Sequence, residues 1–225
     1  MVSSEVLAAC PAGDEIDEPL WIHAQQQLMP SPIAHSLAGV SIAWLATPTG
    51  DATAPRRSRL LWAAACVFAA NAPDLDFVGG LLAGSVNAFH GGPTHSLTVA
   101  VLFGGLAAVA AGRLSLSAGH AFAVLGLAYA SHVGLDLMSG FVERPNTLAV
   151  FWPFSAVRYT APWHPFPGIL HGPPGGDLAG FLDEFLSLSN LRAVAVEATL
   201  GIPLAAAVWL TCRSVRTAER PKTES

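Results

Sequence analysis

The chain has 225 residues, of which 52% are hydrophobic and only 12% charged, and its formal net charge at pH 7 is −5. A soluble domain usually carries about twice this share of charged residues, so the composition excludes an ordinary soluble fold and favours lipid as the solvent of much of the surface. The acidic balance provides no basic surface for nucleic acid, and we expect no nucleic-acid partner.

Residues 1–30 are rich in Asp and Glu and have neither the basic start nor the apolar core of a signal peptide. We expect them to form a disordered acidic tail before a helical domain at 31–212.

Five apolar segments follow the tail, at 33–46, 60–70, 97–111, 118–137 and 193–212. A membrane-spanning helix needs roughly 20 residues, so the last two can span a bilayer, whereas the first two could be re-entrant or buried helices. All five are rich in Ala, Leu, Val and Gly, which is typical of packed membrane helices. The segments predict an all-α, multi-helix membrane bundle.

A Pro- and Gly-rich loop is expected at 139–190, because its many prolines exclude a long helix. Residues 177–188 could form a short amphipathic helix within it. We expect the loop to cover one end of the bundle, where His164, His171 and Asp177 could close over a site. Glu197 lies near the end of the last apolar segment and could extend to the membrane interface.

Basic residues predict the orientation of the chain. With five crossings, eight of the eleven Lys and Arg side chains fall on one face: Arg56, Arg57, Arg59, Arg113, Arg213, Arg216, Arg220 and Lys222. The positive-inside rule makes this face cytoplasmic, with a basic cytoplasmic tail at 213–225. We therefore expect a multi-pass protein of the bacterial inner membrane.

Seven side chains able to bind a metal lie near helix ends. If consecutive helices alternate in direction, all seven ends lie on the side of the membrane opposite the basic residues. These side chains should therefore meet at the non-cytoplasmic face. They are His35, Asp74, Asp76, His90, His95, His132 and Asp136.

The local spacing agrees with shared metal ligation. His132 and Asp136 are four residues apart, so they lie about 40° apart on one helical face. Mixed imidazole and carboxylate ligands suit zinc, or manganese or iron, better than calcium. Seven ligands could hold two or three ions, or one ion with supporting partners.

Some of the polar residues also have simpler structural explanations than a role in a metal site. His120 could be an interface residue, Asp74 a turn residue after a proline, and Ser96 a helix N-cap rather than a nucleophile. An ionisable pair such as His132 and Asp136 inside an apolar helix is costly, which favours a functional role.

Five sequence features together resemble the YdjM-like family of bacterial membrane-bound metal-dependent hydrolases: His35, the segments 73–76, 90–96 and 131–136, and Phe-Trp-Pro-Phe-Ser at 151–155. The resemblance covers about residues 30–160 and implies metal binding by the seven residues above. Gly91 stands where the family commonly has Arg, so any phosphate contact by that Arg is absent here. By distant analogy, the order of Asp and His is similar to zinc-dependent phospholipases C and single-strand nucleases.

These observations predict a metal-dependent hydrolase that cleaves a phosphoester with metal-activated water, with Asp74 or Asp76 as the base. The expected substrate is a small molecule or a membrane lipid with a phosphate headgroup. One alternative is a non-enzymatic membrane protein that binds or senses a metal, and another is an amidase or esterase.

Overall fold

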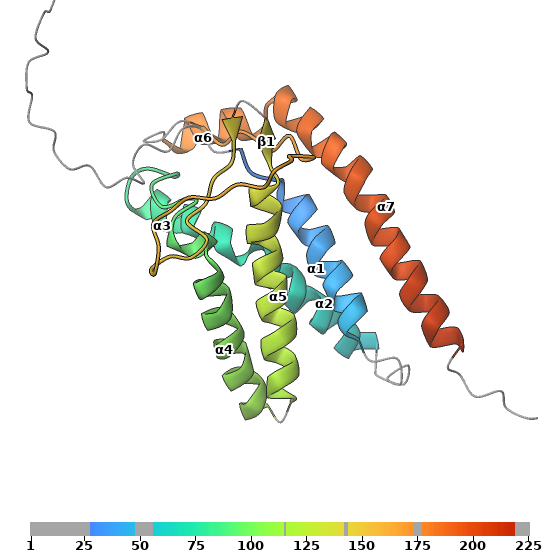
Figure 1. Ribbon diagram of the computed structural model, residues 1–225. Coiled ribbons are helices and arrows are strands. Elements are labelled where there is room, and N and C mark those ends of the chain that lie inside the picture. Colours follow the sequence, from blue (N-terminus) through green and yellow to red (C-terminus); the bar gives the residue numbers. More distant parts are fainter. Residues whose placement is uncertain (1–27, 48–55, 115, 142–143, 173–176, 219–225) are drawn as a thin grey trace, which may run out of the picture.

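The computed structural model describes residues 28–47, 56–114, 116–141, 144–172 and 177–218, and these form an all-α bundle as predicted (Figure 1). The elements, with 3₁₀ helices labelled η, are α1 Pro32–Ala46, α2 Arg56–Asn71, η1 Ala72–Leu75, α3 Asp76–Leu82, η2 Pro93–His95, α4 Leu97–Arg113, α5 Ala118–Leu137, β1 Gly140–Phe141, β2 Arg144–Pro145, α6 Leu178–Phe185 and α7 Leu188–Ala218.

The five predicted apolar helices are confirmed as α1, α2, α4, α5 and α7. Helix α7 is longer than predicted, because it spans 31 residues, Leu188–Ala218, and so extends beyond both ends of the predicted segment 193–212. The short helix α3 was not predicted. It follows η1 and α2 so closely that residues 57–82 form one apolar stretch of 26 residues.

Several helices begin at a residue whose side chain accepts a hydrogen bond from a backbone N–H three residues on. Ser31, Ser96, Ser117 and Asp177 cap α1, α4, α5 and α6 in this way. Each cap satisfies a donor that the first helical turn leaves without a partner. The prediction that Ser96 is an N-cap is therefore confirmed.

Small residues allow the helices to pack closely. Helix α4 packs along α5, and α1 contacts α2, α5 and α7. A Cβ atom on Gly39 of α1 would lie 2.8 Å from the carbonyl oxygen of Cys66 in α2, so these helix backbones touch only because position 39 is glycine. Close approach at small residues is a common way for membrane helices to associate.

The outer surface of the bundle is apolar, as expected for contact with lipid. Large side chains such as Phe68, Leu106, Leu204 and Leu210 are more than half exposed. Three stretches in the described residues are long and apolar enough to cross a membrane, at 57–82, 118–137 and 188–218. The helix ends that carry Arg57, Arg113 and Arg213 gather at one end of the bundle (Figure 1).

The loop after α5 lies across the other end of the bundle (Figure 1). The backbone N–H of Leu97 donates to Val150, and Ile169 pairs with Met29. Val150 also packs with Val133 and Leu137 of α5. The loop is thus attached to the start of α4, the end of α5 and the segment before α1.

The structure corrects the predicted boundaries of the helical domain at both ends. Residues 28–30, assigned to the disordered tail, are buried, so the ordered domain begins before residue 31. At the C-terminus, α7 includes residues 213–218 of the predicted basic tail. The rest of both tails lies outside the described residues.

Candidate metal centre

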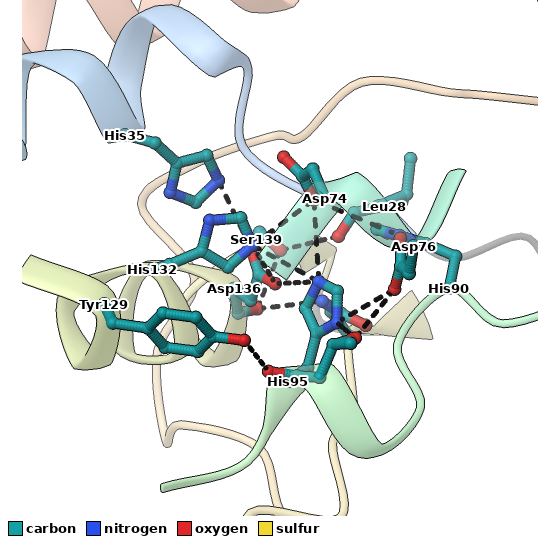
Figure 2. Close-up of polar contacts among 12 residues, drawn as sticks. Leu28, His35, Asp74, Asp76, His90, His95, Tyr129, His132, Asp136 and Ser139 are labelled. Atoms are coloured by element: carbon teal, nitrogen blue, oxygen red, sulfur yellow. Dashed lines mark hydrogen bonds and ion pairs between the residues drawn. The ribbon is translucent and has the colours of Figure 1, made fainter. Parts of the chain in front are cut away.

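The seven predicted ligands lie together at the loop-covered end of the bundle (Figure 2). His35 is in the first turn of α1, and Asp74 and Asp76 lie where α2 gives way to α3. His90 and His95 come from the link before α4, and His132 and Asp136 from the last turns of α5. The predicted convergence of the seven side chains is confirmed.

The link that carries His90 and His95 turns sharply at Gly91, whose φ of +66° lies in the left-handed region. A side chain at that position would be strained, which favours glycine. The turn brings the rings of His90 and His95 to 4.7 Å between centroids.

Two triangles of donor atoms share the edge between His95 and His132, whose Nε2 atoms are 3.2 Å apart. Asp136 Oδ2 lies 3.5 Å from His95 Nε2 and 3.3 Å from His132 Nε2. Asp74 Oδ1 lies 3.5 and 3.4 Å from the same two atoms. A tetrahedral ion with ligands at about 2.0–2.1 Å separates them by about 3.3–3.4 Å. Both triangles therefore have the dimensions of one face of a zinc site.

The backbone orients His132. Its Nδ1 lies 2.8 Å from the carbonyl oxygen of Ala70, which can only accept a hydrogen bond. Nδ1 therefore carries the proton, and Nε2 presents a lone pair to the shared edge. His35 stacks on the same ring at 3.8 Å, and its Nε2 lies 3.4 Å from Asp136 Oδ1.

His95 is oriented by Thr94 and Asp76. The Thr94 hydroxyl donates to Asp76 Oδ2 at 2.8 Å, and His95 Nδ1 lies 3.0 Å from that hydroxyl and 3.4 Å from the carboxylate oxygen. With Nδ1 donating to these oxygens, His95 Nε2 also presents a lone pair. Tyr129 supports the turn by donating to the Thr94 carbonyl oxygen at 2.8 Å.

Asp76 also contacts His90, whose Nδ1 lies 3.1 Å from Oδ1. Both carboxylate oxygens of Asp76 thus face protein donors. By contrast, neither Asp74 nor Asp136 has a hydrogen-bond partner for either carboxylate oxygen within the described part of the chain. Asp74 and Asp136 are the carboxylates whose lone pairs remain for an ion.

Hydrogen bonds from neighbouring segments also hold the C-terminal end of α5 in place. Asn146 Nδ2 donates to the carbonyl oxygen of Asp136 at 3.1 Å. Ser139 Oγ contacts the same carbonyl at 2.8 Å and that of Leu28 at 2.6 Å (Figure 2). These contacts tie α5 to the loop and to the segment before α1. Sequence reasoning missed both residues. Ser139 lies only three residues after Asp136, a spacing that could have suggested the contact, whereas no local pattern relates Asn146 to Asp136.

The donor set fits a divalent cation. With both rings neutral, two imidazole lone pairs would face each other at 3.2 Å beside two carboxylate oxygens, all of them buried or nearly so. Such an arrangement is repulsive unless a positive charge lies among the four atoms. In the protein without an ion, burial lowers the pKa of His95, but the Asp74 and Asp76 carboxylates outweigh burial and raise it to about 9.

Three groups could hold a metal ion: His35, Asp74 and His132; Asp74, His90 and His95; and His95, His132 and Asp136. Together they include six of the seven predicted ligands. Asp76 is in none of them and instead contacts two of the histidines. The structure thus offers His/Asp groups that could hold a metal ion.

Other polar residues belong to none of these groups. His120 stacks on Trp62 at the far end of α5, which agrees with an interface role. Of the loop residues, His164 is hydrogen-bonded to Thr160 and Asp177 caps α6. His171 is buried beside His90. The expectation that Glu197 reaches the interface is wrong, because its side chain is fully buried and accepts from the Ser31 backbone N–H at 2.8 Å.

Comparison with known proteins identifies the family of the chain. No match was found among curated proteins or among solved structures. The model of the family described as YdjM inner membrane protein matches residues 29–215, which extends the resemblance through the loop and into α7. The chain therefore belongs to the YdjM inner membrane protein family.

Proposed function

We propose that this protein is a membrane-bound, metal-dependent hydrolase that cleaves a phosphoester, with a phosphate-bearing membrane lipid as its substrate class. One observation carries the proposal: the Nε2 atoms of His95 and His132 lie 3.2 Å apart beside the carboxylates of Asp74 and Asp136. When bound there, a divalent ion supplies Lewis acidity and lowers the pKa of water towards neutrality.

The three carboxylates have different roles in this proposal. Both carboxylate oxygens of Asp74 are buried, and Oδ2 has no hydrogen-bond partner in the described residues. We assign it as the group that accepts a proton from water. Asp76 is a positioning residue, because it holds the Nδ1 edges of His90 and His95. Asp136 binds the ion with His132.

The substrate class follows from where the site lies. The cluster is at the end of apolar helices, and the helix ends that carry Arg57, Arg113 and Arg213 lie at the opposite end (Figure 1). By the positive-inside rule, this supports a site on the non-cytoplasmic face, at the depth of lipid headgroups. A phosphate ester there would have its anionic oxygens beside the ion.

Metal analysis and substrate screening of the full chain in detergent would test this function. We expect bound zinc, manganese or iron, and release of phosphate or of a phosphorylated headgroup that stops with chelator and returns with metal. The Asp74→Asn variant should hold less metal than the natural protein and lose turnover. Tight metal binding without cleavage of any phosphodiester, amide or ester would instead favour metal sensing or storage, and amide or carboxyl-ester cleavage alone would favour the amidase or esterase alternative.

A further inference from the structure

His171 is a buried histidine of the loop that belongs to none of the three metal-binding groups. Its side chain is only 4% exposed and its ring meets that of His90 at 4.8 Å, edge to face. Phe77 packs against both rings, stacking on His90 at 4.2 Å and meeting His171 at 5.5 Å. The loop therefore brings an eighth candidate ligand to the edge of the cluster.

Asn87 fixes which nitrogen of His171 carries the proton. The Asn87 amide nitrogen donates to the carbonyl oxygens of His171 and Gly172 at 2.7 and 3.1 Å. Because carbonyl oxygens only accept, these bonds determine which end of the amide is Oδ1. That oxygen lies 3.1 Å from His171 Nδ1, so Nδ1 donates to it.

His171 Nε2 consequently bears a lone pair. Nε2 is buried and has no hydrogen-bond partner among the residues that the structure describes. A neutral imidazole with one nitrogen held by a second residue is the usual form of a metal-binding histidine.

The group of Asp74, His90 and His95 has no fourth donor of its own, because the neighbouring His132 Nε2 also faces Asp136. A tetrahedral zinc site has four ligands, of which a catalytic site leaves one position for water or substrate. His95 is also shared with His132 and Asp136. An ion in this outer group therefore benefits most from an added nitrogen next to His90.

We propose that His171 Nε2 is an eighth ligand of the metal centre, supplied by the loop to the ion held by Asp74, His90 and His95. This inference rests on the proposed metal site but does not depend on the reaction. It gives the loop a direct role in closing the outer side of the centre.

The test is metal binding by a His171→Phe variant of the full chain in detergent, because phenylalanine keeps the ring packing and removes the nitrogen. We expect the affinity for one zinc equivalent to fall about 100-fold or more, since even residues that only orient a ligand contribute about 10–100-fold. The visible spectrum of the cobalt-substituted protein should change with it. His164→Phe, in the same loop but bonded to Thr160, is the matched control and should leave both unchanged.

A second variant separates ligation from loop anchoring. In His171→Gly, added imidazole should restore zinc affinity and the cobalt spectrum, because it replaces the missing nitrogen; an anchoring role would give no rescue and would overturn the inference. An unchanged cobalt spectrum and affinity in His171→Phe would also overturn it, while leaving the proposed function intact. Absence of bound metal in the natural protein would refute both.

Discussion

Replacing His132 with alanine removes one of the two side chains, the other being His95, whose Nε2 atoms belong to both donor triangles. His95, Asp74 and Asp136 would keep their positions, but each triangle would lose two of its three edges. Loss of a ligand should cost more than the loss of an orienting residue, so we expect metal affinity to fall by more than about 100-fold.

The loss can be measured as thermal stabilisation by metal. At a free metal concentration of 100 Kd, binding stabilises the natural protein by about 2.7 kcal/mol. If the variant binds 100-fold more weakly, the same metal concentration equals its Kd, and the stabilisation falls to about 0.4 kcal/mol. The assay is the unfolding midpoint of each protein in detergent, with and without zinc.

His120→Ala is the matched control, since it is the same substitution in the same helix but at the end where the ring stacks on Trp62. This variant should lower the midpoint of thermal unfolding slightly, and zinc should raise that midpoint as much as in the natural protein. Equal metal-dependent shifts in His132→Ala and in the natural protein would refute the assignment of His132 as a ligand.

Three further predictions test orientation, the nucleophile and proton release. A reporter that is active only outside the cytoplasm, fused after Ser225, should stay silent, and a strong signal would reverse the orientation. Ser96→Ala should lose a cap of about 1 kcal/mol but keep most of any hydrolytic rate, whereas Asp76→Ala should lose the rate; a covalent adduct on Ser96 would contradict this. Without metal, the pKa of His95 is raised to about 9, and only the neutral ring can bind a metal. Metal affinity should therefore weaken about tenfold for each pH unit below 9, and competition titrations can measure this change.

The convergence of the metal ligands was predictable because helix direction alternates in an up-down bundle. The seven side chains occur at alternate helix ends, so the count of apolar segments already places them on one face. The spacing of His132 and Asp136 likewise required only helical geometry.

The sequence alone could not show which carboxylates bind the metal and which only orient the histidines. Asp74 and Asp76 are both acidic and two residues apart, yet Asp76 faces Thr94 and two histidines, whereas Asp74 keeps its oxygens free of hydrogen-bond donors in the described region. That difference depends on how η1 meets η2, which no local pattern encodes. Glu197 was misread for a related reason: its partner is a backbone N–H at Ser31, 166 residues away in the chain.

Charge favours two ions in the centre rather than one. Three carboxylates and four neutral imidazoles carry −3, so one divalent ion leaves −1 and two leave +1. A buried net negative charge would repel a phosphate ester, whereas +1 would attract it and offset the cost of burying three carboxylates near lipid. A neutral His171 does not change this sum. We therefore expect about two zinc ions per chain, and one in the Asp74→Asn variant, by elemental analysis of purified protein. A natural protein that saturates at one ion would leave the site negative and would argue against an anionic substrate.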